Sequence, residues 1–371
     1  MPKLFLLPAS TGKRAALWGL IFFVCAQAAL SVYLNGQRLE LRDPVFGLRL
    51  RTLRKRLREN PGAPLVLVLG SSRALNGLSP AYMPVSPDRK SPLVYNFAFA
   101  GAGSVRELMT FRRLRAAGIR PDWLLTEVWP VLWPEDGAFA ERLLISEDEL
   151  CWTDLTVLSR YLPGKLDFFA RALRGNLVPL VCYRSRLLRA AARFLLPREL
   201  NQRLAQEDND WTSTDETGWL PCRKIPPDRA AQRREVDKGL LVAAPLLNPL
   251  RISSDSDRAL RELLNECRAG GIQTALFLMP EHSACRGWYT PETQSAVRGY
   301  LRQLSQGYQV PVIDARDWAP DEHFADFCHM APQGVKPFSE RFARDVLRPW
   351  LQGGPLDRTV LLQQAEVKQE P

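Results

Sequence analysis

A serine and a short Asp-x-x-His motif, far apart in the sequence, have the residue types of a catalytic triad. Asp326 precedes His329 by three positions, so on a helical turn both side chains lie on one face and the carboxylate can orient the imidazole. Ser72 ends a Gly-Ser-Ser turn that directly follows an apolar run. A serine hydroxyl becomes a nucleophile when an imidazole takes its proton and a carboxylate holds that imidazole in one tautomer. We therefore predict that Ser72 is the nucleophile, His329 the base and Asp326 the residue that orients the base.

Residues next to these motifs leave alternatives open. Ser71 is the second candidate nucleophile. Cys328 adjoins His329, but neighbours in sequence rarely have the geometry for one to activate the other, so we expect no catalytic thiol. His323 has acidic neighbours and is predicted to be solvated. Because the chain has three His and no Cys-x-x-Cys pair, we expect no metal site, and we expect no cofactor.

Alternating apolar and amphipathic stretches must position these residues. The apolar runs predict strands over residues 65–69, 93–98, 123–128, 272–279 and 310–313. Helices are predicted over 104–117, 256–269 and 292–305, each followed by glycine, and a final helix carries apolar residues from 338 to 350. Strands that alternate with helices of this length indicate parallel pairing and right-handed crossovers. We expect an α/β fold with a doubly wound, mainly parallel five-stranded sheet, and a site at the carboxyl ends of its strands.

An uncharged stretch near the N-terminus, residues 15–34, is long enough to cross a bilayer core. We predict a single-pass transmembrane helix preceded by a cytoplasmic segment, 1–14. The alternative is a cleaved signal peptide, because Ala26-Gln27-Ala28 fits a cleavage site. Both interpretations place the main domain outside the cytoplasm, in the periplasm. The positive-inside rule does not support this orientation, since five arginines between residues 38 and 54 outnumber the cations before the stretch.

The remaining chain divides by pattern into a linker helix, 35–62, an α/β domain, 63–134 and 250–352, an inserted helical cap, 135–249, and a flexible tail, 353–371. With 371 residues, 46% of them hydrophobic, a large core is expected. Six of the seven cysteines lie beyond the apolar stretch, which permits disulfides outside the cytoplasm.

The net charge of +10 is concentrated in the predicted cap. Residues 171–203 carry eight arginines against one acid, Glu199, and apolar residues interleave with them. This pattern predicts basic amphipathic helices that contact an anionic lipid surface or an anionic polymer. No nucleic-acid motif is present, and we expect no nucleic-acid partner.

The two motifs resemble those of the SGNH (GDSL-like) hydrolase superfamily. Gly70-Ser71-Ser72 is similar to the Gly-Asp-Ser block, with Ser72 in the third, nucleophilic position, and Asp326 with His329 is similar to the final block. Gly334 also fits the pattern that leads into the closing helix. The resemblance covers residues 64–351, interrupted by the cap. It implies a flavodoxin-like sheet that carries the nucleophile just after its first strand.

The resemblance also implies donors for an oxyanion hole. Residues 96–103 look like the second block, whose glycine offers a backbone N–H, and Gly101 or Gly103 would serve together with the N–H of Ser72. A tight strand-to-helix turn explains these glycines equally well. The third block normally supplies an Asn, and here residues 126–130 read Thr-Glu-Val-Trp-Pro, so that donor is missing. Arg73 is a candidate replacement and substrate-binding residue, with an ordinary surface arginine as the alternative. His282, after a predicted strand, is a further candidate for substrate contact, with an ordinary loop residue as the favoured alternative.

A membrane segment joined to this version of the motifs resembles the subgroup that acylates cell-envelope glycans, such as alginate O-acetylation and D-alanyl transfer proteins. The expected function is a membrane-anchored serine esterase or O-acyltransferase that acts on a cell-envelope polysaccharide or an acyl donor, beside a membrane-bound O-acyltransferase. The alternative is a catalytically degenerate member that binds glycan or acts as a scaffold in an envelope complex.

Overall fold

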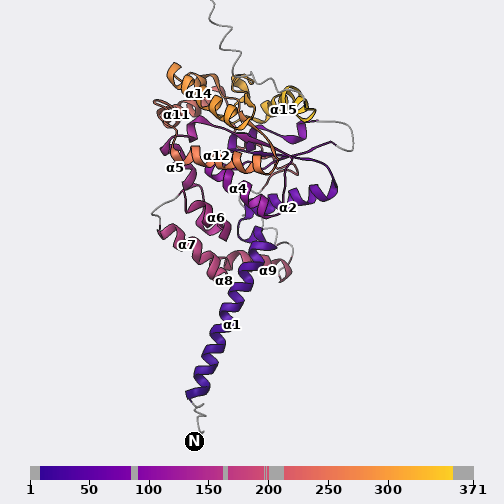
Figure 1. Ribbon diagram of the computed structural model, residues 1–371, viewed down its shortest axis with the longest axis vertical. Helices are drawn as coiled ribbons and strands as arrows, with labels where there is room; N and C mark the ends of the chain where they lie inside the picture. Colours follow the sequence, from indigo (N-terminus) through magenta and orange to yellow (C-terminus); the bar gives the residue numbers. More distant parts are fainter. Residues whose placement is uncertain are drawn as a thin grey trace, which may run out of the picture. The chain divides into compact units, whose positions relative to one another are not determined.

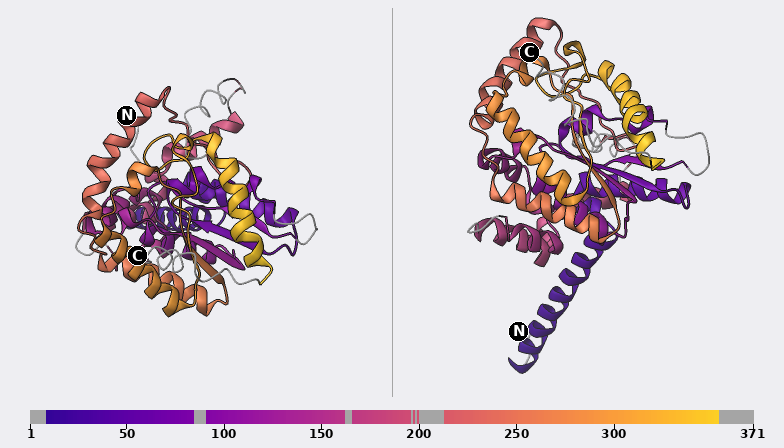
Figure 2. Two further views of the ribbon diagram at one scale, coloured as in Figure 1. Left: turned by 90° about the horizontal axis from the view of Figure 1, so that it is seen from above. Right: turned by 45° about the horizontal axis from the view of Figure 1, so that its top comes forward.

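Five parallel strands form the sheet that positions the candidate residues (Figures 1 and 2). The computed structural model describes residues 9–84, 91–161, 166–195, 197, 199 and 213–353. The strands are β1 (Leu65–Leu69), β2 (Leu93–Asn96), β3 (Trp123–Glu127), β4 (Gln273–Leu278) and β5 (Val312–Asp314). Their order is β2-β1-β3-β4-β5, and every pair is parallel. The predicted doubly wound, flavodoxin-like sheet is confirmed.

The strands are apolar along almost their whole length because helices cover both faces of the sheet. In β4, Leu276 and Leu278 belong to one core, together with residues of α12 (Ser254–Ala269) and α14 (Pro291–Tyr308). Phe277 belongs to the opposite core, which includes residues of α3 (Ser72–Gly77) and α15 (Pro332–Phe342). Alternate side chains of one strand therefore stabilise two separate layers.

The predicted helices are confirmed with small differences at their ends. The helix predicted over 104–117 is α4 (Ser104–Ala116), and Gly118 follows it with a φ of +83°, a left-handed conformation that favours glycine. The final helix begins as α15, continues through a π-helical turn (Ala343–Leu347) and ends as α16 (Arg348–Leu351). The other elements of this part of the fold are α2 (Pro44–Glu59), α5 (Glu135–Leu143), α11 (Arg229–Leu247), α13 (Ser283–Arg286) and the 3-10 turns Pro80–Tyr82, Pro130–Leu132 and Asp321–His323.

Two compact units divide the chain differently from the predicted domains. The sheet unit comprises Arg49–Ile145 and Ser213–Pro371, and the second unit comprises Met1–Leu48 and Ser146–Thr212. The part of the insertion that lies outside the sheet unit, Ser146–Thr212, is therefore shorter than the predicted cap, 135–249. The physical reason is packing, because α5 contacts α4 and α11 contacts the 3-10 turn Pro130–Leu132, both within the sheet unit.

The second unit contains α1 (Ala9–Gly36), α6 (Trp152–Leu158), α7 (Leu166–Leu177), α8 (Pro179–Cys182) and α9 (Arg184–Leu195), with 3-10 turns at Leu39–Leu41 and Glu147–Glu149. Residues Gly12–Gly36 of α1 form a helix long and apolar enough to cross a membrane. Most of the predicted cytoplasmic segment, residues 1–8, and of the predicted tail, residues 354–371, lies outside the described residues. All seven cysteines are free thiols.

Candidate active site

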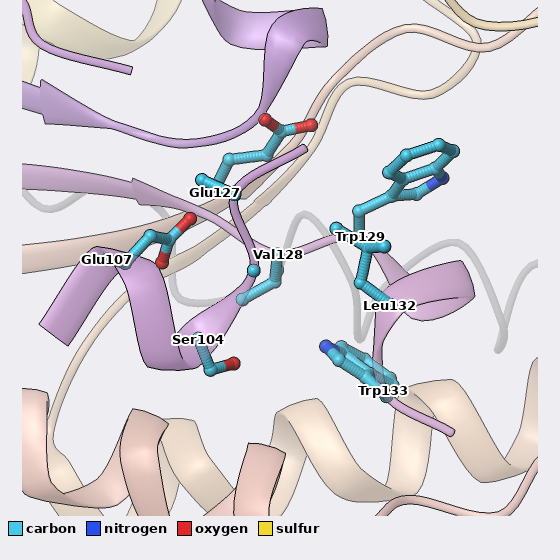
Figure 3. A pocket seen from close by; sticks show the side chains of 9 residues that line it. Ser104, Glu107, Glu127, Val128, Trp129, Leu132 and Trp133 are labelled. Carbon is cyan, nitrogen blue, oxygen red and sulfur yellow. The ribbon is translucent and has the colours of Figure 1, made fainter. Parts of the chain in front are cut away.

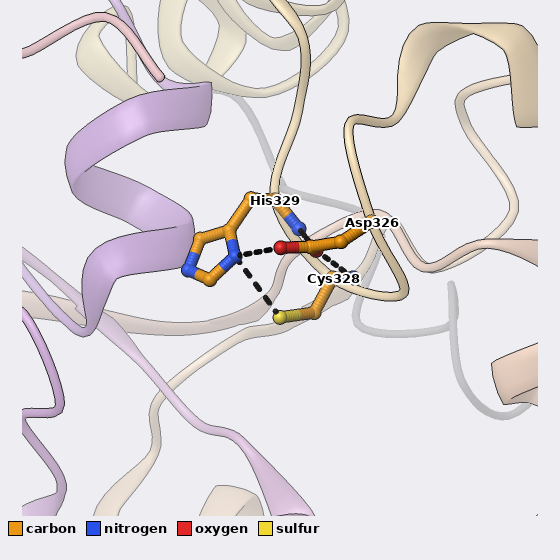
Figure 4. Close-up of side chains that lie close together, drawn as sticks. All are labelled: Asp326, Cys328 and His329. Atoms are coloured by element: carbon orange, nitrogen blue, oxygen red, sulfur yellow. Dashed lines mark hydrogen bonds and ion pairs between the residues drawn. The ribbon is translucent and has the colours of Figure 1, made fainter. Parts of the chain in front are cut away.

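Ser72, His329 and Asp326 meet at the carboxyl edge of the sheet. Ser72 is the first residue of α3, directly after β1, and its Oγ lies 2.7 Å from Nε2 of His329, which is 257 positions away in the chain. The other ring nitrogen, Nδ1, lies 2.7 Å from Oδ2 of Asp326 (Figure 4). The side chains of His329 and Asp326 are each 26% exposed, so the site is open to solvent. The structure thus brings together all three residues that the sequence predicted.

Asp326 and His329 are held by a closed loop and not by the helical turn that the sequence predicted. Oδ1 of Asp326 accepts hydrogen bonds from the backbone N–H groups of Cys328 and His329, both at 2.8 Å. The N–H of Ala325 donates to the carbonyl of His329, which closes the loop. An aspartate side chain that bonds the backbone shortly after it replaces a helical turn in this way.

The negative charge of Asp326 is stabilised by its contacts with His329 and with two backbone N–H groups. Burial opposes ionisation of this carboxyl, but the hydrogen bond and charge of His329 and the two backbone N–H donors together hold its pKa below the usual value. A proton on Nδ1 of His329 satisfies the contact with Asp326 and leaves the lone pair of Nε2 facing the hydroxyl of Ser72. This is the arrangement in which an imidazole accepts the proton of a serine.

Ser71 has a different role from Ser72. Its N–H and its hydroxyl both donate to Oε2 of Glu127, at 2.8 and 2.9 Å, and its oxygen accepts the N–H of Arg73 as the N-cap of α3. Glu127 ends β3, at the place where the sequence lacks the expected Asn. Ser71 and Glu127 therefore fix the turn that carries Ser72, and the imidazole meets Ser72 and not Ser71.

Replacing Glu127 with Ala removes the acceptor for both groups of Ser71. We expect a loss of about 1–3 kcal/mol in the free energy of unfolding, because a buried N–H is left without a partner. Turnover of an ester substrate should fall about 10-fold as the turn around Ser72 loosens. Glu127→Gln keeps an acceptor oxygen and should recover most of the turnover. Urea unfolding and steady-state kinetics measure both effects, and an alanine variant with normal turnover would contradict the positioning role.

Arg73 is buried and not a surface or substrate-binding residue, which corrects the prediction from the sequence. Its side chain is 0% exposed, and Nη2 donates to the carbonyl oxygens of Met279 and Pro280 at 2.8 and 3.1 Å. The guanidinium lies 3.4 Å from Glu281 and 3.7 Å from Glu127. Burial opposes the charge of Arg73, but these two carboxylates raise its pKa above the usual value. Arg73 is therefore a cation that joins the ends of β3 and β4 beneath Ser72.

The oxyanion donors predicted for this site differ in their availability. The N–H of Ser72 lies in the first turn of α3, where it has no acceptor within the helix. The N–H of Gly103 already donates to Oε1 of Glu141 at 2.9 Å, so Gly103 is not an available donor, which corrects the prediction. Gly101 has a φ of +64°, which only glycine adopts easily, and its role as a donor stays a prediction.

Glu141 closes the N-terminus of α4 from the neighbouring helix α5. Its Oε1 accepts the N–H groups of Gly103 and Arg106, and a Cβ at Gly103 would lie 2.9 Å from its Oε2. Burial raises the pKa of Glu141 to about 7, against hydrogen bonds and charges that lower it. The carboxyl therefore titrates near neutral pH beside the turn that follows β2.

The raised pKa of Glu141 predicts how stability depends on pH. In the unfolded chain this group loses its proton near its ordinary pKa of 4.5, while the folded protein keeps the proton up to about pH 7. The folded state binds more protons in this window, so the free energy of unfolding should fall as pH rises, by up to about 3 kcal/mol. Glu141→Gln should flatten this dependence, measured by urea unfolding on both sides of the window. The exposed control Glu322→Gln should leave the slope as in the unmodified chain, and an equally steep slope in Glu141→Gln would refute the assignment.

His282 and His323 have local structural contacts. Nδ1 of His282 accepts the N–H of Ala284 at 3.2 Å, so this side chain caps α13, and its ring packs on Phe324. Contact of His282 with a substrate stays a prediction. His323 is half-buried and not simply solvated. Its backbone lies close to Gly334, where an added Cβ would be 2.6 Å from the Cβ of His323. Gly334 is thus required by this close approach.

Cys328 lies beside the imidazole but is poorly suited to chemistry. Its Sγ is 3.5 Å from Nδ1 of His329 (Figure 4), and burial raises the pKa of the thiol well above its ordinary value, with the charge of Asp326 adding to the effect. Asp326, Cys328 and His329 place ligand atoms within 4.8 Å of one another. A metal ion there would take the atoms of Asp326 and His329 that now bind each other.

A small pocket adjoins the site at the end of β3 (Figure 3). It lies between the loop before α4 and the segment after β3. Glu127 takes part in its lining and also binds Ser71, so the pocket and the turn that carries Ser72 share one residue. The pocket is lined by Ala102, Gly103, Ser104, Glu107, Glu127, Val128, Trp129, Leu132 and Trp133.

In the described site, the hydroxyl of Ser72 contacts the imidazole of His329, and that imidazole contacts the carboxylate of Asp326. No family model and no curated protein matches this chain. We therefore infer its function from the geometry of the site.

Several residues that shape the site were not identified as site residues from the sequence. Asn96 is fully buried, and its Nδ2 donates to the carbonyl oxygens of Ala74 and Leu78, which holds the middle and the C-terminal end of α3. Glu141 accepts the N–H of Gly103, and Glu281 forms an ion pair with Arg73, so both contact residues that the sequence predicted. The available signal was a polar side chain at the end of an apolar run, which Asn96 and Glu127 both show.

Proposed function

We propose that this protein is a serine esterase or O-acyltransferase with Ser72 as its nucleophile. The observation that carries the proposal is the continuous contact from Ser72 to His329 to Asp326, with 2.7 Å at each step. Hydroxyl, imidazole and carboxylate in this order are the parts that activate a serine for attack on an acyl carbon.

The reaction follows from the positions of these atoms. Oγ of Ser72 attacks the carbonyl carbon of an ester donor while Nε2 of His329 takes the hydroxyl proton. The N–H of Ser72, with Gly101, stabilises the oxyanion. As the bond to the leaving alcohol breaks, His329 returns the proton to that alcohol, and the acyl group stays on Ser72. Water or a sugar hydroxyl then attacks the acyl-enzyme and gives its proton to His329, and His329 returns a proton to Oγ of Ser72 as the bond between the acyl group and the serine breaks.

The resemblance to SGNH hydrolases supports this function. The nucleophile follows β1 of a flavodoxin-like sheet, and the Asp-x-x-His loop precedes α15, as that superfamily requires. With α1 as a transmembrane anchor and the sheet unit outside the cytoplasm, the substrates in our proposal are a cell-envelope polysaccharide and its acyl donor. A membrane-bound O-acyltransferase would supply the acyl group. The assignment of substrates is an analogy with the subgroup, since a fold hosts many functions.

A second candidate is a catalytically degenerate glycan-binding or scaffold subunit. Two observations favour it. The third-block Asn is replaced by Glu127, so one expected oxyanion donor is missing, and the N–H of Gly103 is taken by Glu141, which leaves Gly101 as the glycine candidate. Each such donor typically contributes about 10²-fold to turnover.

A fluorophosphonate probe distinguishes the two candidates in the full chain. Ser72 displaces fluoride from phosphorus while His329 takes the hydroxyl proton, which leaves a stable phosphonyl ester on the serine. Labelling at Ser72, located by peptide mass spectrometry, supports the enzyme. No labelling, together with measurable binding to a polysaccharide, supports the scaffold.

A further inference from the structure

An unpartnered row of leucines runs along α7 in the second unit. Leu166, Leu173 and Leu177 are 81%, 40% and 55% exposed. Their spacing of seven and four residues places them on one face of the helix. Arg174 lies on the adjacent side of the same helix, Arg171 lies further round it beside Glu147, and Ala172 and Asn176 form its buried face. α7 is thus apolar on a side that does not face its own unit.

Exposed apolar residues are also found on α8 and α9. Leu180 and Val181 of α8 are 50% and 42% exposed, and Leu188 of α9 is 67% exposed. The arginines beside them, Arg184 and Arg189, are exposed as well. A face that alternates exposed leucines with arginines is typical of helices that lie in a membrane interface.

α7 and α8 pack directly on the apolar helix α1, and α9 packs on α8 (Figure 1). Gln27 is buried within the apolar stretch of α1, and its Oε1 accepts the N–H of Leu180 at 3.1 Å. That N–H lies in the first turn of α8, where it has no acceptor in its own helix. Ser31 and Leu34, one and two turns further along α1, are also buried on this side, whereas residues 12–26 are exposed.

A buried arginine fixes the segment after α1 to α7. Arg42 is 0% exposed and donates to Oδ1 of Asn176 at 2.5 Å and to the carbonyl of Leu150 at 2.9 Å. Its guanidinium also lies over the ring of Tyr183. The helices α7 and α8 therefore hold a fixed position along α1.

We propose that α7, α8 and α9 form an interfacial collar around α1, with their leucines in the acyl-chain boundary of the bilayer and their arginines on anionic phospholipid headgroups. Twenty uncharged residues, 15–34, span about 30 Å as a helix, which matches the hydrocarbon core. Gln27 lies seven residues before the end of this stretch, or about 10 Å inside its edge. Amphipathic helices settle about 5–10 Å into this boundary, so α8 meets α1 at the expected depth. This proposal does not depend on the catalytic role of Ser72.

Single-cysteine fluorescent labels on the full chain in nanodiscs test the collar. The background carries Cys25→Ala, Cys151→Ser, Cys182→Ser and Cys222→Ser, which removes the thiols that are not buried. Leu173→Cys and Leu188→Cys place labels on the apolar face, and Asp167→Cys places a control label on the polar side of α7. Bilayers contain phosphatidylglycerol with doxyl-labelled acyl chains, and iodide is the aqueous quencher.

Doxyl lipid should quench the labels at 173 and 188 at least about twofold more than the label at 167, and iodide should show the reverse order. Arg184→Gln with Arg189→Gln should reduce lipid quenching at position 188 in the anionic bilayer. Iodide quenching at all three positions would overturn the proposal, because the face would then be in water. Protection of 173 and 188 from both quenchers would also overturn it, since another protein would then cover the face.

Discussion

Replacing Ser72 with Ala should lower ester hydrolysis or acyl transfer by at least about a thousandfold and abolish fluorophosphonate labelling. The hydroxyl that lies 2.7 Å from the imidazole is then absent, and no other described hydroxyl contacts Nε2 of His329. His329→Ala should cost a similar factor, because the serine loses the group that takes its proton. The two substitutions together should cost little more than either alone, since the residues act as one unit. Steady-state rates and labelling rates of the full chain measure these effects.

The matched control for this prediction is Cys328→Ala. The thiol lies 3.5 Å from the same imidazole but on the side of Nδ1, so its removal leaves the contact between Ser72 and His329 in place. We expect labelling within about threefold of the unmodified chain. Normal turnover in Ser72→Ala, or turnover lost in Cys328→Ala in a folded protein, would show that the nucleophile has been misassigned.

The largest effect on stability is expected from Arg73→Met, at about 3–5 kcal/mol. Glu127 and Glu281 would remain in the interior without the cation that now compensates them, and both side chains are almost fully buried. Burial already raises the pKa of Glu281 despite the nearby Arg73 and Arg316. Removal of Arg73 should therefore drive one of these carboxyls to take up a proton. Urea unfolding measures the loss in the free energy of unfolding. A change in how this free energy depends on pH reports the uptake of the proton by the carboxyl.

Arg112 provides the control for Arg73, because it also binds two glutamates, Glu262 and Glu266, but at the surface with 27% of its side chain exposed. Arg112→Met should cost about 1 kcal/mol or less. Adding Glu127→Gln and Glu281→Gln to Arg73→Met should restore part of the stability, because the uncompensated charges are then gone. If Arg73→Met lowered the free energy of unfolding as little as Arg112→Met, Arg73 would not be needed to compensate the charges of Glu127 and Glu281.

The fold was predictable because each buried strand leaves a local signal. The run at 65–69 is apolar throughout, and β1 has those bounds. The ends of β2 and β4 were less predictable, since apolar residues continue beyond the last ladder pair. In β2, for example, Phe97 and Ala98 are buried in the following loop and not in the strand. The division into units was not predictable, because it depends on which helices pack on the sheet and not on their own patterns.

The candidate site was predictable in its residue types but not in its surroundings. Ser72, Asp326 and His329 have a recognisable chemistry and follow strands or precede a helix. The burial of Arg73 left no local signal, because an arginine after a glycine-rich turn is usually solvated. Its two partners, Glu127 and Glu281, come from the ends of other strands, and only the assembled sheet places them around it. The same holds for Glu141, which reaches Gly103 from a helix that the sequence assigned to the insertion.

The separation of 257 positions between the serine and its base has a consequence for biosynthesis. The first strand and its hydroxyl leave the ribosome early, whereas the imidazole arrives only when the last crossover has been made. Pairings this distant form late, because the ends of a long chain must first be brought together. A nascent or truncated polypeptide therefore carries the hydroxyl without its activator. In the proposed mechanism, reactivity is in this way confined to molecules that have finished folding.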